Sequence, residues 1–195
     1  MTRPIVAYGD PVLKRRAEAI DLEEAGSWLG PLIEDMYETL YNAHGVGLAA
    51  PQIGESLRLF ITDASAYADQ DEEMEPLRDF KEVFINPEII EEEGDEWRFE
   101  EGCLSIPNIR EEVSRSPIVR IRYYDRDLRL RDKRYQGLAA RIVQHEYDHI
   151  EGILFTDHLR PLKKRLLKRK LKDISEGKVD VAYRMRFPSS KKVKR

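Results

Sequence analysis

Apolar residues recur at the spacing of an amphipathic helix in three stretches of the chain. The first extends from about residue 27 to 43, and the second leads up to His149 and ends before Gly152. The third extends from about residue 161 to 174, with one apolar side made of Leu162, Leu166, Leu167, Leu171 and Ile174. A stripe of this kind buries one face of a helix against the rest of a protein. The pattern therefore predicts three helices.

Four shorter runs are rich in β-branched and aromatic residues and are bounded by polar or turn-forming residues. They predict strands at residues 57–62, 82–90, 118–124 and 128–135. The Asp-Arg-Asp sequence between the last two runs is typical of a hairpin turn. The polar, acidic residues from 63 to 79 predict a surface loop, whereas residues 175–195 show only a weak pattern. This mixture of helices and strands predicts an α+β fold.

The composition is that of one globular domain. The chain has 195 residues, of which 41% are hydrophobic and 36% charged, and this length and balance allow one buried core with a charged surface. Uninterrupted apolar runs are short, and the first residues lack the apolar core of a signal peptide. A single cysteine excludes an internal disulfide. These features predict a cytoplasmic protein with no membrane partner.

Charge is distributed unevenly along the chain. The net charge is −4 at pH 7. From residue 160 onward the chain has 15 Lys and Arg and 3 Asp and Glu, so the residues before 160 carry a net charge of −16. A basic C-terminal region is either a solvated helix face or disordered end, or a patch that binds RNA or another polyanion. From charge alone, both interpretations stay open.

The second helical stretch carries a His-Glu-x-x-His sequence. Because an α-helix advances 100° per residue, His145 and His149 lie about 40° apart around the helix and about 6 Å apart along it, so both can bind one metal ion. Glu146 then lies beside the open coordination position, where it can take a proton from water. Leu138 and Ile142 continue the stripe, which gives the site apolar surroundings. The arrangement predicts metal-assisted hydrolysis, although two histidines on a helix are more often ordinary core or surface residues.

A catalytic metal of this kind takes a third protein ligand. His158 lies nine residues after His149, whereas the extended metzincin pattern requires six, and Glu151 follows too closely to fold back. Cys103, the only cysteine, is the remaining candidate. A lone cysteine is ordinarily a small buried hydrophobic residue. The residues by themselves leave both interpretations of Cys103 open.

Three motifs taken together are more specific than any one of them. The chain contains Gly-Val-Gly-Leu-Ala-Ala-Pro-Gln at 45–52, Glu-Gly-Cys-Leu-Ser at 101–105 and Gln-His-Glu-Tyr-Asp-His at 144–149. In this order they resemble the three motifs of the peptide deformylase family, over about residues 4–174. The resemblance implies antiparallel sheets packed around the His-Glu-x-x-His helix. It places a catalytic domain at residues 1–174, including a basic helix at 161–174, and a basic tail at 175–195.

The resemblance also implies the reaction. Enzymes of this family remove the formyl group from the N-terminal formyl-methionine of new polypeptides and release formate. One divalent ion, usually Fe²⁺ and replaceable by Zn²⁺, Ni²⁺ or Co²⁺, is then held by Cys103, His145 and His149. By the same resemblance, Glu146 moves the proton of the attacking water. The side-chain amide of Gln52 and the backbone N–H of Leu104 stabilise charge on the formyl oxygen.

The substrate side of the site is likewise implied by the resemblance. The slot for the methionine side chain, with Arg141 beside it, is lined by Val46, Phe99, Leu138 and Ile142. The peptide backbone pairs with Val46, Gly47 and Gly102 in the manner of an added strand. Arg110 lies near the downstream residues of the peptide, unless it is an ordinary surface arginine. The formyl carbon is crowded by Gly47, Gln52 and Leu104. This crowding excludes longer acyl groups.

Partners follow from the resemblance and the charge together. In related bacterial enzymes the C-terminal helix docks on the ribosome near the exit of the nascent chain, and the basic C-terminal region suits rRNA. The predicted partners are therefore N-formyl-methionyl nascent peptides and the ribosome, with no DNA partner.

Two other functions compete with this prediction. A zinc peptidase of the His-Glu-x-x-His class would leave Cys103 free, and a metal-bearing ribosome-associated binder would lack turnover. The intact Glu146 and Gln52 argue against the binder, because binding alone needs neither. The poor third-ligand options and the two other motifs argue against the peptidase. Arg115 and Asp148 are further predicted to pair and to steady the ligand helix.

Overall fold

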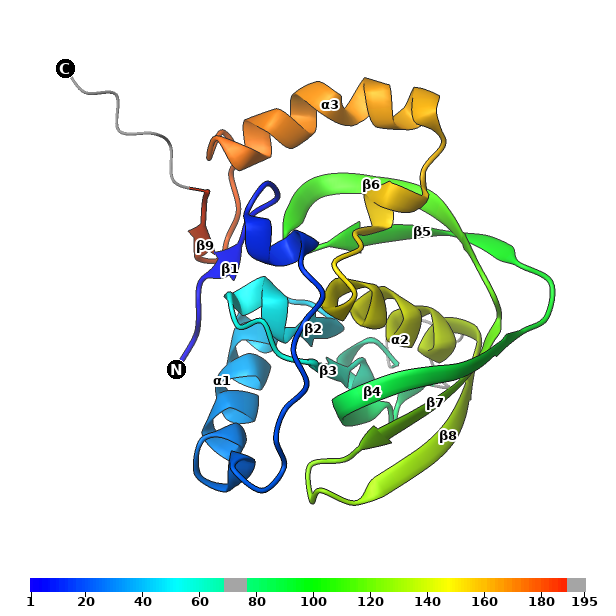
Figure 1. Cartoon of the computed structure of the whole chain (residues 1–195). Helices are drawn as coiled ribbons and strands as arrows, with labels where there is room; N and C mark the ends of the chain where they lie inside the picture. Colours follow the sequence, from blue (N-terminus) through cyan, green and yellow to red (C-terminus); the bar gives the residue numbers. More distant parts are fainter. Residues whose placement is uncertain (69–76, 189–195) are drawn as a thin grey trace.

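The computed structural model describes residues 1–68 and 77–188. Its α-helices are α1 Leu29–Asn42, α2 Gly137–Ile150 and α3 Pro161–Ser175. Its strands are β1 Ile5–Val6, β2 Gly47–Ala49, β3 Leu59–Asp63, β4 Lys81–Glu93, β5 Trp97–Cys103, β6 Ile106–Arg115, β7 Ile118–Tyr124, β8 Leu130–Gln136 and β9 Met185–Arg186. Antiparallel sheets lie around α2 (Figure 1), so the predicted α+β fold is confirmed.

Five strands form the main sheet in the order β2-β3-β4-β7-β8, and every neighbouring pair is antiparallel. Burial alternates along β7, where Val119, Ile121 and Tyr123 face the core while Arg120 and Arg122 face solvent. This period of two is typical of a sheet with one buried face. β7 and β8 form the hairpin that the Asp-Arg-Asp sequence predicts.

Helix α2 lies between the main sheet and a separate hairpin of β5 and β6 (Figure 1). On the sheet side it buries Ala140, Val143 and Ile150 completely. On the hairpin side, Arg141 and His145 reach the strand β5. A helix enclosed on both sides carries polar groups into the interior, where each of them needs a partner. This position of α2 determines the surroundings of the predicted metal ligands.

The helix α3 lies on the outer side of the β5–β6 hairpin (Figure 1). Three apolar residues of α3 are buried there, namely Leu167, Leu171 and Ile174. Leu162 and Leu166, however, are 66% and 69% exposed, so the predicted single apolar side of this helix is wrong for these two residues. Positions 166 and 167 point about 100° apart, and only one of them can face the hairpin.

The four predicted strands correspond to β3, β4, β7 and β8 and differ from them mainly in extent, since β4 continues beyond the predicted end at Ile90 to Glu93. No strand was predicted at β2, β5 or β6. Charged residues interrupt the apolar pattern of β6, although Ile109 and Val113 are buried. β9 is too short to show a period, and its pairing with β1 depends on the tertiary fold. Of the predicted loop at 63–79, residues 69–76 lie outside the described residues.

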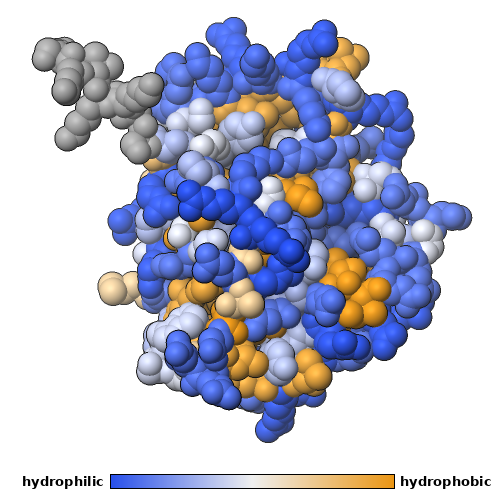
Figure 2. Space-filling view, viewed as in Figure 1, coloured by the Kyte–Doolittle hydropathy of each residue, from blue (hydrophilic) through white to orange (hydrophobic). Residues whose placement is uncertain are grey.

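The visible surface is largely polar. Figure 2 shows hydrophilic residues over most of this face, with apolar atoms gathered in separate patches. Among the helices of the described residues, none is long and apolar enough to cross a membrane.

Candidate active site

Two elements carry the predicted metal ligands to the centre of the molecule. α2 supplies His145 and His149, whose ring centroids lie 5.1 Å apart. β5 ends at Cys103, which faces Ile106 of β6 across a two-residue turn. The hairpin turn therefore brings a thiol next to two imidazoles that are one helical turn apart.

The side chains of Cys103, His145 and His149 form a group that fits one metal ion. Their ligand atoms all lie within 4.8 Å of one another, and Cys103 Sγ lies 3.3 Å from His149 Nε2. Ligands of one tetrahedral ion, with bonds of about 2.0 to 2.3 Å, lie roughly 3.5 Å apart. Burial by itself would raise the pKa of Cys103, but the imidazoles of His149 and His145 lower it to about 5. A thiolate with two imidazoles suits several transition metals and does not select among them.

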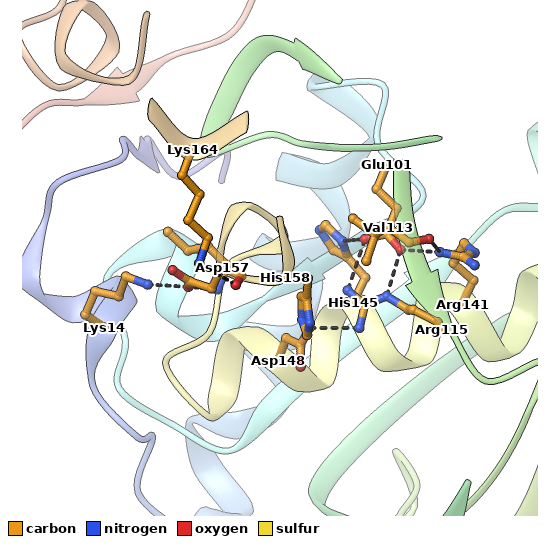
Figure 3. A network of polar contacts seen from close by, with 11 residues as sticks. Lys14, Glu101, Val113, Arg115, Arg141, His145, Asp148, Asp157, His158 and Lys164 are labelled. Atoms are coloured by element: carbon orange, nitrogen blue, oxygen red, sulfur yellow. Dashed lines mark hydrogen bonds and ion pairs between the residues drawn. The ribbon is translucent and has the colours of Figure 1, made fainter. Parts of the chain in front are cut away.

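Glu101 lies beside His145 in a network of polar contacts (Figure 3). Its carboxylate accepts a hydrogen bond from His145 Nδ1 at 2.9 Å, which leaves Nε2 of that ring for a metal. Arg115 donates to both carboxylate oxygens at 2.7 and 3.0 Å, and Arg141 donates to one of them at 2.7 Å. Burial alone would raise the pKa of Glu101, but His145 and Arg115 hold it well below its usual range. Glu101 belongs to the motif at residues 101–105, but the sequence pattern predicted no role for it.

Asp148 extends the same network along α2 (Figure 3). It accepts hydrogen bonds from Arg115 Nη1 at 2.8 Å and His158 Nε2 at 2.7 Å. The predicted contact between Arg115 and Asp148 is therefore present. Glu151 points elsewhere, because its carboxylate pairs with Arg58 at 2.6 Å. His158 and Glu151, the two candidates that spacing disfavoured as ligands, thus have other partners.

Glu146 lies on α2 between the two histidines and is only 4% exposed. Burial raises its pKa to about 7, although the imidazoles of His145 and His149 act in the opposite direction. Within the described residues its Oε2 is buried without a hydrogen-bond partner. A carboxyl group in this state can accept a proton and release it again near neutral pH.

Gln52 presents the donor end of its amide to the site. Its Oε1 accepts the backbone N–H of Ala49 at 2.8 Å, which fixes the orientation of the side chain. Its Nε2 consequently lies 3.4 Å from Cys103 Sγ and 3.4 Å from Ser105 Oγ. An N–H group held in this way can stabilise negative charge that develops beside Cys103.

One cavity of about 960 Å³ opens onto these groups. Its lining includes the residues predicted for substrate binding and for the oxyanion, namely Val46, Gly47, Gln52, Phe99, Gly102, Leu104, Arg110, Leu138 and Ile142. Arg141 also lines it, but its guanidinium is buried, stacks on Trp97 at 4.4 Å and pairs with Glu101. The structure thus brings every predicted site residue to one cavity except His149 and places His149 behind its wall, against Cys103.

One part of the cavity wall comes from residues for which no role was predicted from the sequence. Residues 180–183, which follow α3, line the cavity as well. These residues fall in the stretch of weak pattern, where neither period nor motif indicated a role. Only the return of the chain after α3 brings them to the site.

A carboxyl group that titrates near neutrality, next to ligands for a metal and an amide aimed at the same space, is suited to the attack of water on a carbonyl carbon. The fold and the site therefore define a metal-dependent hydrolase.

The chain is similar to known proteins in both sequence and fold. A family described as polypeptide deformylase matches residues 2–165, and the chain belongs to this family. It is 55% identical to a peptide deformylase of Christiangramia forsetii, with 100% of both chains covered. It is 53% identical to a peptide deformylase of Cytophaga hutchinsonii, covering 98% of this chain and 100% of the relative. A peptide deformylase structure from Legionella pneumophila matches with a TM-score of 0.78 at 39% identity, covering 91% of this chain and 98% of that one.

The reaction predicted from the three motifs is thereby confirmed. The chain is a hydrolase that removes the formyl group from the N-terminal formyl-methionine of newly made polypeptides, and metal dependence is typical of its family.

The close approach of the Gly47 backbone to Glu146 can be tested by substitution. In Gly47→Ala, the new Cβ would lie 2.5 Å from Glu146 Oε1, so the carboxylate must move. Because misplacing a catalytic group by about 1 Å can cost on the order of 10²-fold, kcat/KM for formate release should fall by about that factor. Gly30→Ala is the matched control, since within the described residues its Cβ would meet nothing within 4 Å. Equal activity of Gly47→Ala and wild type would contradict the close approach of Gly47 to Glu146.

Proposed function

We propose that Cys103, His145 and His149 bind the catalytic ion, that this ion is Fe²⁺ in the cell, and that Zn²⁺, Ni²⁺ or Co²⁺ can replace it. The mutual spacing of the three side chains and the low pKa of the thiol support this ligand set. A divalent ion held there supplies Lewis acidity, which lowers the pKa of water and polarises a carbonyl group. A thiolate ligand is also a site of oxidation, so the iron form should need anaerobic handling.

Glu146 acts as the general base and then as the general acid. It takes a proton from the attacking water and returns it to the amine that leaves with the peptide. Its place on α2, beside the ligands yet outside the group that can hold the metal, supports this role. The juxtaposition of Glu146 with the group formed by Cys103, His145 and His149 is the observation that carries the proposal.

Charge that develops on the formyl oxygen is stabilised by Gln52 Nε2 and by the backbone N–H of Leu104. The fixed orientation of the Gln52 amide supports this assignment, since its oxygen is already occupied by Ala49. Leu104 follows Cys103 directly and lines the same cavity. Preorganised donors of this kind need no rearrangement as the charge forms.

The remaining cavity binds the substrate. The methionine side chain occupies an apolar slot made by Val46, Phe99, Leu138 and Ile142. The peptide backbone pairs with Gly47 and Gly102, and Arg110 lies near the downstream residues. All of these residues line one cavity, which supports a single continuous peptide site. Gly47 leaves little room beside Glu146, which favours a formyl group over longer acyl groups.

Variants of Gln52 test the proposal through formate release from formyl-Met-Ala-Ser under anaerobic conditions. Wild type should release formate, and Gln52→Ala should lower kcat by about 10²- to 10³-fold because one oxyanion donor is lost. Gln52→Glu keeps an oxygen for the Ala49 N–H but replaces the donor by a carboxylate oxygen beside Cys103, so its kcat should fall at least as far. Metal content and melting temperature are measured on the same samples. An active Gln52→Glu enzyme would remove Gln52 from the mechanism, and an inactive, iron-loaded wild type would overturn the proposed site.

We further propose that the enzyme works in the cytoplasm at the ribosome, with neither a membrane nor DNA as a partner. The outer surface of α3 supports docking on rRNA, since Arg165, Lys168 and Arg169 are exposed. Replacing these three by Gln should weaken ribosome binding at low salt and lower the slope of log Kd against log salt by up to about three. The control replaces Arg120, Arg122 and Lys133 on the main sheet by Gln. Equal effects of the two triple variants would remove α3 as the docking surface.

A further inference from the structure

The chain segment after α3 is built into the wall of the active-site cavity. Residues 180–183 line the cavity together with Cys103 and Leu104. Asn108 of β6 donates a hydrogen bond from Nδ2 to the backbone oxygen of Asp180 at 3.3 Å. A segment from the far end of the sequence therefore faces the same space as the proposed catalytic groups.

This segment is held in place on both sides. β9 pairs with β1 in parallel, and the backbone N–H groups of Ile5 and Ala7 donate to Arg184 and Arg186 at 2.9 and 2.8 Å. Val179, Met185 and Phe187 pack against the cluster of buried residues beneath α3. At Gly54 a Cβ would lie 2.6 Å from the guanidinium of Arg186, so the absence of a side chain there leaves room for the Arg186 side chain of β9.

The two ends of the chain also hold the turn that carries Cys103. The hydroxyl of Tyr183 donates to the backbone oxygen of Leu104 at 2.8 Å. The backbone N–H of Tyr8 donates to the backbone oxygen of Ser105 at 2.9 Å. Both carbonyls of the two-residue turn are thus bonded to segments that β1 and β9 join together. Fixing these carbonyls limits rotation of the backbone on either side of them.

We propose that residues 180–183 form part of the peptide-binding site and that Tyr183 is a positioning residue for the turn of Cys103, Leu104 and Ser105. The inference rests on the proposed role of the Leu104 N–H as an oxyanion donor. Tyr183 acts on the chemical step through the Leu104 backbone. Ala182 is exposed at the cavity wall, so a larger side chain there narrows the path of the downstream peptide.

Tyr183→Phe tests the positioning role, because it removes the hydroxyl and keeps the ring. Loss of one hydrogen bond that orients an oxyanion donor should lower kcat for formyl-Met-Ala-Ser about three- to ten-fold. KM should stay within twofold of wild type, which separates positioning from substrate binding. Tyr41→Phe is the matched control, since the Tyr41 hydroxyl bonds to Asp63 outside the cavity lining. A Tyr183→Phe kcat equal to wild type, or a fall matched by Tyr41→Phe, would overturn the positioning role.

Ala182→Trp tests the peptide-binding wall independently. KM for formyl-Met-Ala-Ser should rise at least fivefold, whereas KM for formyl-methionine amide, which lacks downstream residues, should stay within twofold. An unchanged ratio of the two KM values would remove residues 180–183 from the substrate site. Wild type in the same assay separates this inference from the proposed function. If wild type releases no formate, the proposed site fails, whereas active wild type with two unaffected variants overturns this inference alone.

Discussion

Replacing Glu146 with alanine is expected to lower kcat for formate release by about 10²- to 10⁴-fold, the usual contribution of a positioned general acid–base group. Alanine cannot move a proton between the attacking water and the leaving amine. Metal binding should persist, because the group that fits the ion consists of Cys103, His145 and His149. Steady-state formate release and metal content per chain, determined on the same anaerobic samples, measure both effects.

Glu146→Gln is the matched variant, since it keeps the shape of the side chain and removes its basicity. Neither variant should lower the melting temperature, because Glu146 Oε2 is buried without a hydrogen-bond partner among the described residues. Removing a buried polar group that has no hydrogen-bond partner should leave the protein as stable as wild type or more stable. Loss of the metal from both variants would show that Glu146 is a ligand, and a kcat above a tenth of wild type would exclude it as the proton carrier.

Replacing Glu101 with alanine is expected to produce the largest loss of stability. Glu101 is only 6% exposed, and its removal leaves the buried guanidinium groups of Arg115 and Arg141 without their shared carboxylate. Breaking a buried charge network by removing one partner typically costs about 3 to 5 kcal/mol. For a chain of this size, that corresponds to a fall in melting temperature of roughly 6 to 20 °C. Thermal unfolding followed by circular dichroism measures it.

The same variant should weaken metal binding. His145 Nδ1 loses its acceptor, and the loss of such a partner typically costs about 10- to 100-fold in metal affinity. Glu100→Ala is the matched control, because the side chain of the neighbouring Glu100 is 59% exposed and pairs with Arg110 at 3.7 Å. It should change stability by less than about 0.5 kcal/mol. A Glu101→Ala protein as stable as Glu100→Ala would contradict the role of Glu101 in the network.

The Glu101 network also explains how α2 can bury polar side chains between the main sheet and the β5–β6 hairpin. The helix is covered on one side by the main sheet and on the other by the β5–β6 hairpin, so Arg141 and His145 enter the interior. Each of them has a charged or polar partner on the hairpin. These hydrogen bonds hold the ligand helix against the strand that carries Cys103, and they connect the stability of the fold to the geometry of the metal group.

Local pattern predicted most of the regular elements. The stripe through Leu138, Ile142 and the two histidines predicted a buried α2, and the β7–β8 hairpin followed from alternation and turn residues. β6 was missed because charges interrupt its apolar pattern, and the burial of Ile109 and Val113 depends on α3 and β5. The exposure of Leu162 and Leu166 shows the converse limit, since an apolar side chain is buried only where another element covers it.

The amino-acid sequence by itself determined the family, the reaction and the residue types of the site. Helical geometry places His145, Glu146 and His149 within one turn wherever the helix lies, so their proximity is a local property. The tertiary structure decided everything that depends on distant segments: Cys103 beside His149, Glu101 beneath His145, and Tyr183 on the Leu104 turn. Contacts between residues far apart in sequence cannot be predicted from a local period or spacing. They arise only when the hairpin, the ligand helix and the returning C-terminal segment pack together.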